Sequence, residues 1–234
     1  MVRTVKIDEQ TWRFEEDGVR FFLLTGSERA LLIDSGMQTH NAKELAEALT
    51  DLPLSLLNTH ADPDHIGSNG EFDAFYMHPA ECDNFYGKQS RQGKILPVWD
   101  GDLIDLGGQP LRVIALPGHT PGSIAVLDET NRRLFSGDPV QDGRIFMFGE
   151  CREMHAYIHS LRRLEKMTGL FDEIYPSHGS CPVSPAFIPQ LITAAEEILA
   201  GSAKGMSGNV FGQPITAYDM GVATFLCDRK GGER

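Results

Sequence analysis

The sequence has few cysteines, a deficit of basic residues and no long apolar run. Its four cysteines are scattered without a C-x-x-C pair, which favours reduced thiols over a disulfide framework: Cys82, Cys151, Cys181 and Cys227. With 21 Lys and Arg against 33 Asp and Glu, the net charge is −12. We therefore expect no nucleic-acid surface, because phosphate binding needs clustered cations. No apolar stretch approaches the roughly 20 residues of a membrane span, so no membrane partner is expected.

We also expect no targeting segment. Residues 1–6 are not followed by an apolar core, so we expect no signal peptide and a cytoplasmic location. At 234 residues and 41% hydrophobic content the chain can bury a sizeable core.

Side chains that bind metals are concentrated in residues 58–67, Asn-Thr-His-Ala-Asp-Pro-Asp-His-Ile-Gly. His60, Asp62, Asp64 and His65 fall within six residues, directly after the apolar run 54–57. Imidazole and carboxylate together suit zinc, iron or manganese. The run therefore predicts a metal site.

Hydrophobic periodicity predicts strands that alternate with helices. Strands are expected at residues 19–24, 30–33, 54–57, 75–77, 102–106, 111–116, 124–127, 133–135 and 173–175. Helices are expected at 41–49, 79–86, 154–167 and 186–200. Residues 201–212 are rich in glycine and serine and predict a flexible segment, and 217–227 predict one edge strand. Each further His or Asp in a glycine-flanked motif follows a predicted strand, which is where open sheets usually place their sites.

Four short motifs together resemble the metallo-β-lactamase superfamily of hydrolases. They are His60-x-Asp62-x-Asp64-His65, residues 118–122 (Gly-His-Thr-Pro-Gly), residues 136–138 (Ser-Gly-Asp) and residues 177–179 (Ser-His-Gly). Residues 32–36 (Leu-Ile-Asp-Ser-Gly) match the usual start of that family as well. The resemblance implies an α+β fold, an αββα four-layer sandwich with two mixed sheets flanked by helices. It implies one such domain over residues 1–234.

The resemblance also implies a ligand set around two divalent metal ions. His60 and His119 would hold the first ion, and Asp64, His65 and His178 the second. Asp138 would bridge both ions. Zinc is the first expectation, with iron or manganese as alternatives.

Asp62 departs from the family pattern, which usually has histidine there. As a ligand, its carboxylate would reduce the charge of a centre with two metals and one hydroxide from +1 to neutral. Such a centre should favour harder ions over zinc. Alternatively, Asp62 is a carboxylate outside the ligand set, and the first site is weak or empty.

Other residues have less specific predicted roles. Asp34 is expected to orient a histidine or hold the His60 loop. Residues 142–150 resemble a mobile lid, in which Arg144 could pair with a substrate carboxylate or phosphate. Tyr157 is a candidate substrate contact through its hydroxyl, but core packing is the favoured role.

The leading prediction is a metal-dependent hydrolase of a small molecule. A metal-bound hydroxide would cleave an ester, thioester, lactone or phosphoester. Asp62 or Asp64 would act as the catalytic residue that orients or deprotonates the water. The alternatives are an iron-dependent redox or oxygen-using protein of the same fold, suggested by Asp62, and a non-catalytic metal-binding protein.

Overall fold

Two large sheets organise the chain in this computed structural model, which describes residues 2–87 and 93–229. The first sheet has seven strands in chain order: β1 (Arg3–Lys6), β2 (Thr11–Glu16), β3 (Val19–Thr25), β4 (Ala30–Ile33), β5 (Leu54–Leu57), β6 (Ala74–Met77) and β7 (Lys94–Pro97). Pairing is antiparallel from β1 to β4 and parallel from β4 to β7. The parallel half places the carboxyl end of β5, and the loop that follows it, beside that of β4.

The second sheet has five strands in the order β13-β11-β10-β9-β8. Their bounds are β8 (Leu103–Asp105), β9 (Pro110–Ala115), β10 (Ile124–Asp128), β11 (Arg133–Gly137) and β13 (Glu173–Pro176). Only β11 and β13 pair in parallel among these strands as the structure describes them.

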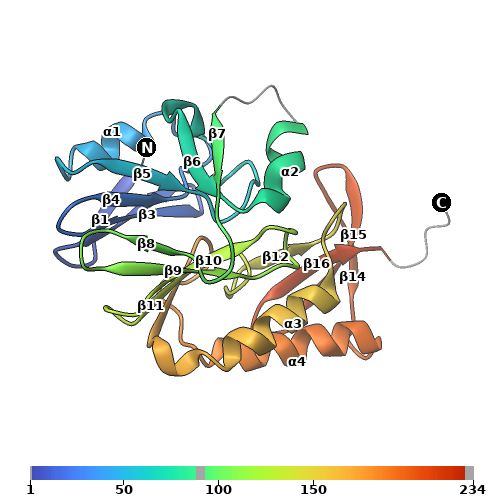
Figure 1. The fold of residues 1–234 in the computed structure, drawn as a ribbon. Coiled ribbons are helices and arrows are strands. Elements are labelled where there is room, and N and C mark those ends of the chain that lie inside the picture. The colour runs from blue at the N-terminus through green and yellow to red at the C-terminus, as the bar shows by residue number, and fades with distance from the viewer. Residues whose placement is uncertain (1, 88–92, 230–234) are drawn as a thin grey trace.

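Helices cover the outer face of each sheet, which gives the four αββα layers (Figure 1). The first sheet is covered by α1 (Ala42–Glu47) and α2 (Cys82–Gly87), and the second by α3 (Met154–Glu165) and α4 (Phe187–Ala200). Three short 3-10 helices are η1 (Asn69–Glu71), η2 (Pro79–Glu81) and η3 (Thr168–Leu170). The predicted fold class is confirmed. Of the described helices, none has the length and apolar character needed to cross a membrane.

Strand β3 is buried on both faces because it lies between two layers. Phe22 and Leu24 point into the core between the two sheets, whereas Phe21 and Leu23 pack toward α1. Alternate residues of a strand point to opposite faces, so a continuous apolar run fills both cores. Each such side chain, fully buried, contributes roughly 1.5–3 kcal/mol. These two cores fix the sheets that carry the site loops.

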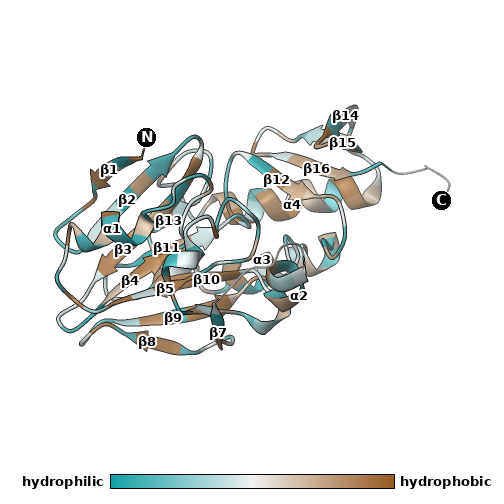
Figure 2. Ribbon diagram, turned by 90° about the horizontal axis from the view of Figure 1, so that it is seen from above, coloured by the Kyte–Doolittle hydropathy of each residue, from teal (hydrophilic) through white to brown (hydrophobic). Residues whose placement is uncertain are grey.

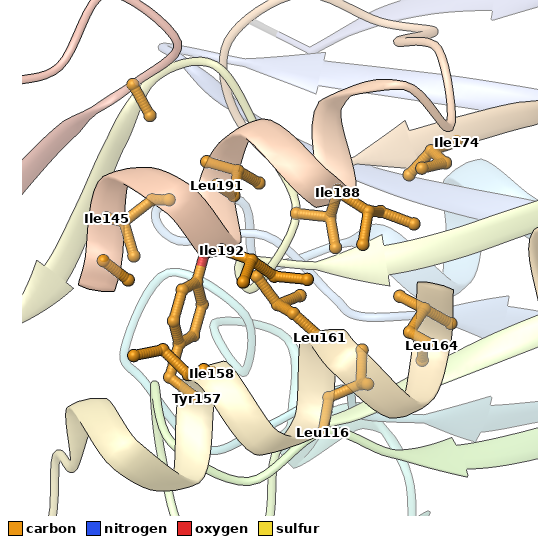
Figure 3. Packing of buried hydrophobic residues seen from close by; sticks show 14 of the residues in the cluster. Leu116, Ile145, Tyr157, Ile158, Leu161, Leu164, Ile174, Ile188, Leu191 and Ile192 are labelled. Atoms are coloured by element: carbon orange, nitrogen blue, oxygen red, sulfur yellow. The ribbon is translucent and has the colours of Figure 1, made fainter. Parts of the chain in front are cut away.

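The core outside the second sheet is built where α3 meets α4. Tyr157, Leu161 and Leu164 of α3 face Ile188 and Leu191 of α4, as Figure 3 shows. The spacing of three and four residues puts these side chains on one helix face. The predicted helix at 154–167 is therefore amphipathic as expected.

A third sheet differs from the sequence expectation. It has the order β12-β16-β15-β14, with β12 (Arg144–Met147), β14 (Met206–Val210), β15 (Gln213–Asp219) and β16 (Thr224–Asp228). It lies to one side of the other strands when the molecule is seen from above (Figure 2). Two predictions are therefore wrong. Residues 142–150 contain a paired strand rather than only a mobile lid, and residues 201–212 contain β14 rather than only a flexible segment.

Candidate metal centre

All seven predicted metal-ligating residues converge on one place. His60, Asp62, Asp64 and His65 lie in the loop after β5, and single residues follow three other strands: His119 after β9, Asp138 after β11 and His178 after β13. Six of these side chains form two groups that could each hold a metal ion, and Asp62 lies beside the first group. Strand ends from both sheets thus bring together residues that are more than 100 positions apart in the sequence.

The first group consists of His60, His119 and Asp138, and the Asp62 carboxylate lies beside it. Nε2 of His60 lies 3.3 Å from Nε2 of His119, and Oδ2 of Asp62 lies 3.6 and 3.5 Å from these two atoms. Oδ2 of Asp138 lies 3.4 Å from Nε2 of His119. A tetrahedral zinc ion with bonds of about 2.0–2.1 Å separates its ligand atoms by about 3.3–3.4 Å. The separations around Nε2 of His119 match this spacing, and Asp62 lies close enough to both histidines to be a further ligand.

The second group uses the other oxygen of the same aspartate. Oδ1 of Asp138 lies 3.2 Å from Nε2 of His65 and 3.3 Å from Nε2 of His178. Oδ2 of Asp64 lies 3.7 and 3.2 Å from these nitrogens. Nε2 of His65 and Oδ1 of Asp138 are buried without a hydrogen-bond partner. Buried polar atoms are rarely left unpaired, so both atoms fit a metal ion as their partner.

All four imidazoles are held by Nδ1 so that Nε2 faces the centre. Nδ1 of His65 donates to Asp34, that of His119 to the Phe146 carbonyl and that of His178 to the Gly18 carbonyl, at 2.7–3.0 Å. The Thr59 hydroxyl donates to Asp34 and so accepts from Nδ1 of His60 at 3.1 Å. Each Nε2, once it carries no proton, can therefore present a lone pair to a metal ion, the state in which histidine binds metals. The orienting role predicted for Asp34 matches these contacts.

The carboxylates of the centre are ionised. Burial opposes ionisation, but His178 and His65 outweigh it and hold the pKa of Asp138 well below 3.8. For Asp62, contacts with His119 and His60 and the charge of Arg152 likewise outweigh burial and hold its pKa well below 3.8. The donor set is therefore anionic before any cation arrives.

Two residues that the sequence analysis did not single out support the centre. Glu81 is fully buried, and its carboxylate accepts from the backbone N–H of Ala61 and of Gly122, both at 2.8 Å. It thereby ties the loop that carries His60 to the loop that follows β9. No local pattern marks Glu81, because its partners lie 20 and 41 residues away.

The second is Arg152, which lies between β12 and α3. Its guanidinium donates to Oδ2 of Asp62 at 2.6 Å and to the carbonyl of His119 at 2.7 Å. Burial and this positive charge lower the pKa of His119, which keeps that imidazole neutral. The sequence analysis assigned the local cation to Arg144 and overlooked Arg152.

The centre borders a cavity of about 1360 Å³. Asp62, Asp64, Asp138 and His178 are among its lining residues. The third sheet and the segments next to its strands supply apolar side chains to the lining, which also contains three arginines and the acidic residues Glu150 and Asp228. The apolar residues and arginines are Phe146, Phe148, Phe211, Pro214, Arg144, Arg152 and Arg229. Ligand cavities are commonly about 300–1000 Å³, so this one has room for a large small molecule.

The two predicted substrate contacts have different positions. Arg144 is exposed and lines the cavity, where it is free to meet a ligand. Tyr157 is fully buried, and its hydroxyl donates to the carbonyl of Pro139 at 2.8 Å. Burial raises its pKa far above 10. The prediction of Tyr157 as a substrate contact is wrong, because the residue packs in the core between α3 and α4.

Comparison with a family model identifies the fold family. The model of the metallo-beta-lactamase superfamily matches residues 15–178. The chain belongs to this superfamily. A solved structure, a metallo-beta-lactamase from Pontibacter korlensis, superposes with a TM-score of 0.70 at 18% identity over 84% of this chain and 99% of that chain. That likeness shows the shared fold.

The proteins similar in sequence to this chain include two kinds of hydrolase. The human acyl-coenzyme A thioesterase MBLAC2 is 30% identical over 210 residues, which cover 71% of this chain and 75% of that protein. The hydroxyacylglutathione hydrolase of Gloeobacter violaceus is 36% identical over 134 residues, which cover 55% of this chain and 52% of that protein. The prediction of a hydrolase of this superfamily is thereby confirmed.

Proposed function

We propose that this chain is a metal-dependent hydrolase that cleaves an acyl thioester of a small molecule. The observation that carries the proposal is the pair of donor groups sharing the Asp138 carboxylate beside the large cavity. Both named relatives act on acyl groups joined to a thiol carrier, which supports a thioester as the substrate.

Two divalent ions fit the donor atoms, with zinc first and iron or manganese as alternatives. His60, Asp62 and His119 would hold one ion, and Asp64, His65 and His178 the other, with Asp138 between them. Such ions, when bound, lower the pKa of water toward neutrality and polarise a carbonyl oxygen.

The residues of the chain position the reactants and move the proton. Asp64 faces the cavity with 28% of its side chain exposed, whereas the Asp62 carboxylate is occupied by Arg152. Burial raises the pKa of Asp64, but His65 and His178 outweigh burial and lower it. Asp64 is therefore ionised, and as the carboxylate that faces the cavity it would orient the attacking water or accept its proton. Of the two catalytic candidates, Asp64 is favoured and Asp62 is assigned to binding and charge.

The cavity lining suits a substrate with an apolar acyl group and an anionic carrier. Phe146, Phe148 and Phe211 offer an apolar wall for the acyl chain. Arg144 and Arg229 lie in the same lining and can pair with phosphate or carboxylate groups. An acyl-coenzyme A or acyl-glutathione molecule has both features.

Thiol release tests the proposal directly. Protein loaded with zinc, iron or manganese is incubated with acyl-coenzyme A and acyl-glutathione thioesters of several chain lengths, and the freed thiol is measured. We expect turnover that disappears on metal removal, returns on reloading and falls at least 100-fold in Asp64→Asn. Loaded protein that releases no thiol from any of these thioesters would refute the proposal.

A control variant separates chemistry from folding. Asp83→Asn lies in the first turn of α2 and outside the donor groups. It should retain wild-type turnover. The alternative of an iron-dependent redox protein predicts colour and oxygen consumption by the iron-loaded protein without thiol release.

A further inference from the structure

Asp62 and Arg152 form a buried ion pair beside the first donor group. Nη2 of Arg152 lies 2.6 Å from Oδ2 of Asp62, and only 13% and 12% of the two side chains are exposed. Charges so removed from water interact more strongly than a surface pair. The oxygen that binds the guanidinium is also the one nearest to Nε2 of His60 and His119.

The backbone around Arg152 fixes the guanidinium beside the His119 loop. The N–H of Glu153 donates to the carbonyl of Gly118 at 2.9 Å, and Nη1 of Arg152 donates to the carbonyl of His119. Nη1 also lies 3.0 Å from both ring nitrogens of His119. A Cβ at Gly118 would lie 2.4 Å from the backbone of Tyr157, so this close approach of loop and helix α3 requires glycine. Arg152 is thus anchored independently of Asp62.

The Asp62–Arg152 pair has a net charge of zero, which is also the charge of a neutral imidazole. A histidine at position 62 would supply one donor atom and no charge. Asp62 supplies one donor atom with a charge of −1, and Arg152 returns the same amount of positive charge within hydrogen-bond distance. The centre therefore keeps the overall charge it would have with histidine and two aspartates.

We propose that Asp62 and Arg152 act as one unit in place of a neutral histidine ligand. Asp62 contributes the ligand atom for the first ion, and Arg152 is a positioning residue that cancels its charge and holds its carboxylate. This inference rests on the proposed metal-dependent function. The net charge of the centre then gives no reason to expect harder ions over zinc, because this centre is no more anionic than one with histidine at position 62.

A double-mutant cycle on metal affinity tests the unit. Metal-free wild type, Asp62→His, Arg152→Gln and the double variant are titrated with zinc against a chromophoric chelator, and bound metal is counted by elemental analysis. Asp62→His should lower the affinity for the first zinc ion at least tenfold, because it leaves an unpaired guanidinium beside the cation. The double variant should recover to within threefold of wild type. Arg152→Gln alone should still bind two ions.

A matched variant separates charge from the mere loss of arginine. Asp62→His combined with Arg152→Lys keeps the uncompensated positive charge and should bind the first ion as weakly as Asp62→His. Arg162→Gln removes an exposed arginine that pairs with Glu196 outside the cavity, and it should leave metal affinity unchanged. If Asp62→His does not fold, Asp62→Asn makes the same change of charge and enters the cycle instead.

The outcomes distinguish this inference from the proposed function. Suppose that the wild type binds two ions and that the double variant binds the first ion as weakly as Asp62→His does. Asp62 and Arg152 would then not act as one unit, but the hydrolase proposal would stand. Loss of both ions in Arg152→Gln would also contradict the proposal that the two residues act as one unit. Arg152 would then be needed for the structure of the site and not for its charge balance. A wild type that binds no ion overturns both proposals.

Discussion

His65 donates from Nδ1 to Oδ2 of Asp34 at 2.8 Å, and both side chains are buried. This contact orients the imidazole so that Nε2 lies 3.2 Å from Oδ1 of Asp138. Asp34 also accepts from the backbone N–H and the hydroxyl of Thr59, at 2.7 and 2.8 Å. The Asp34 carboxylate therefore orients the His65 ring directly and the His60 ring through the Thr59 hydroxyl.

Replacing Asp34 should weaken metal binding without removing a ligand. In Asp34→Asn the amide replaces one acceptor oxygen with a donor, so the contacts with His65 and Thr59 cannot all be kept. Loss of an orienting partner typically lowers metal affinity about 10–100-fold. Zinc titration of the metal-free variant measures this. Asp128→Asn alters a buried carboxylate that accepts from Gln109 and Asn131 and from no donor residue, and its metal affinity should match wild type.

Glu81 should contribute to stability through the two loops it joins. Glu81→Ala leaves the N–H groups of Ala61 and Gly122 buried without an acceptor, and each such group costs about 1–3 kcal/mol. We expect the free energy of unfolding to fall by about 2–4 kcal/mol in urea denaturation of metal-free protein. Glu129→Gln, which breaks a half-exposed ion pair with Arg112, should change it by less than about 1 kcal/mol. Equal effects of the two variants would contradict the tie between the loops.

The comparison of sequence and structure shows which features local patterns can reveal. The strands at 30–33 and 54–57 were predicted with their observed bounds, because apolar runs between loops carry a local signal. The ligand loops follow from these strands and from the motifs. Strand β14 carries no such signal: Met206 is 63% exposed and Gly208 breaks the apolar pattern. It forms because β15 pairs with it, and such pairing is decided by tertiary context.

Ion pairs between distant segments are equally hidden from the sequence. Arg152 and Asp62 are 90 residues apart, and neither lies in a pattern that points to the other. The departure at Asp62 was visible in the sequence, but the residue that compensates for it was not. The charge count made from the sequence alone was therefore incomplete by one positive charge.

Metal binding should release protons at neutral pH. Burial lowers the pKa of His178, but Asp138 and Asp64 outweigh burial and raise it from 6.5 to about 10. In metal-free protein this raised pKa contributes stability that is fully present below pH 6.5 and is lost as pH rises toward 10. An ion at Nε2 must displace that proton, so affinity should increase with pH over the same interval. Calorimetric zinc titration at pH 7.5 in buffers of different ionisation enthalpy should show at least one proton released per protein. Binding enthalpies that do not depend on the buffer would contradict this.

Phe211 should select the acyl chain of the substrate. Its side chain is 86% exposed at the turn between β14 and β15, and its ring lies 6.2 Å from that of Phe146 on the cavity wall. Covering it with an acyl chain would recover about 1–2 kcal/mol, so Phe211→Ser should raise KM for long-chain thioesters about 5–30-fold. The kcat for short-chain thioesters should not change, because the ring is on the wall and not among the donor groups.

A second exposed residue of the same hairpin provides the comparison for Phe211. Met206 is 63% exposed on β14 but does not line the cavity, so Met206→Ser should leave KM unchanged for every chain length. Steady-state thiol release across a series of chain lengths measures both variants. If Phe211→Ser raised KM equally for short and long chains, the ring would not be contacting the acyl chain. The hairpin would then act on the carrier or on access to the cavity, and the apolar wall would have to be assigned to Phe146 and Phe148 alone.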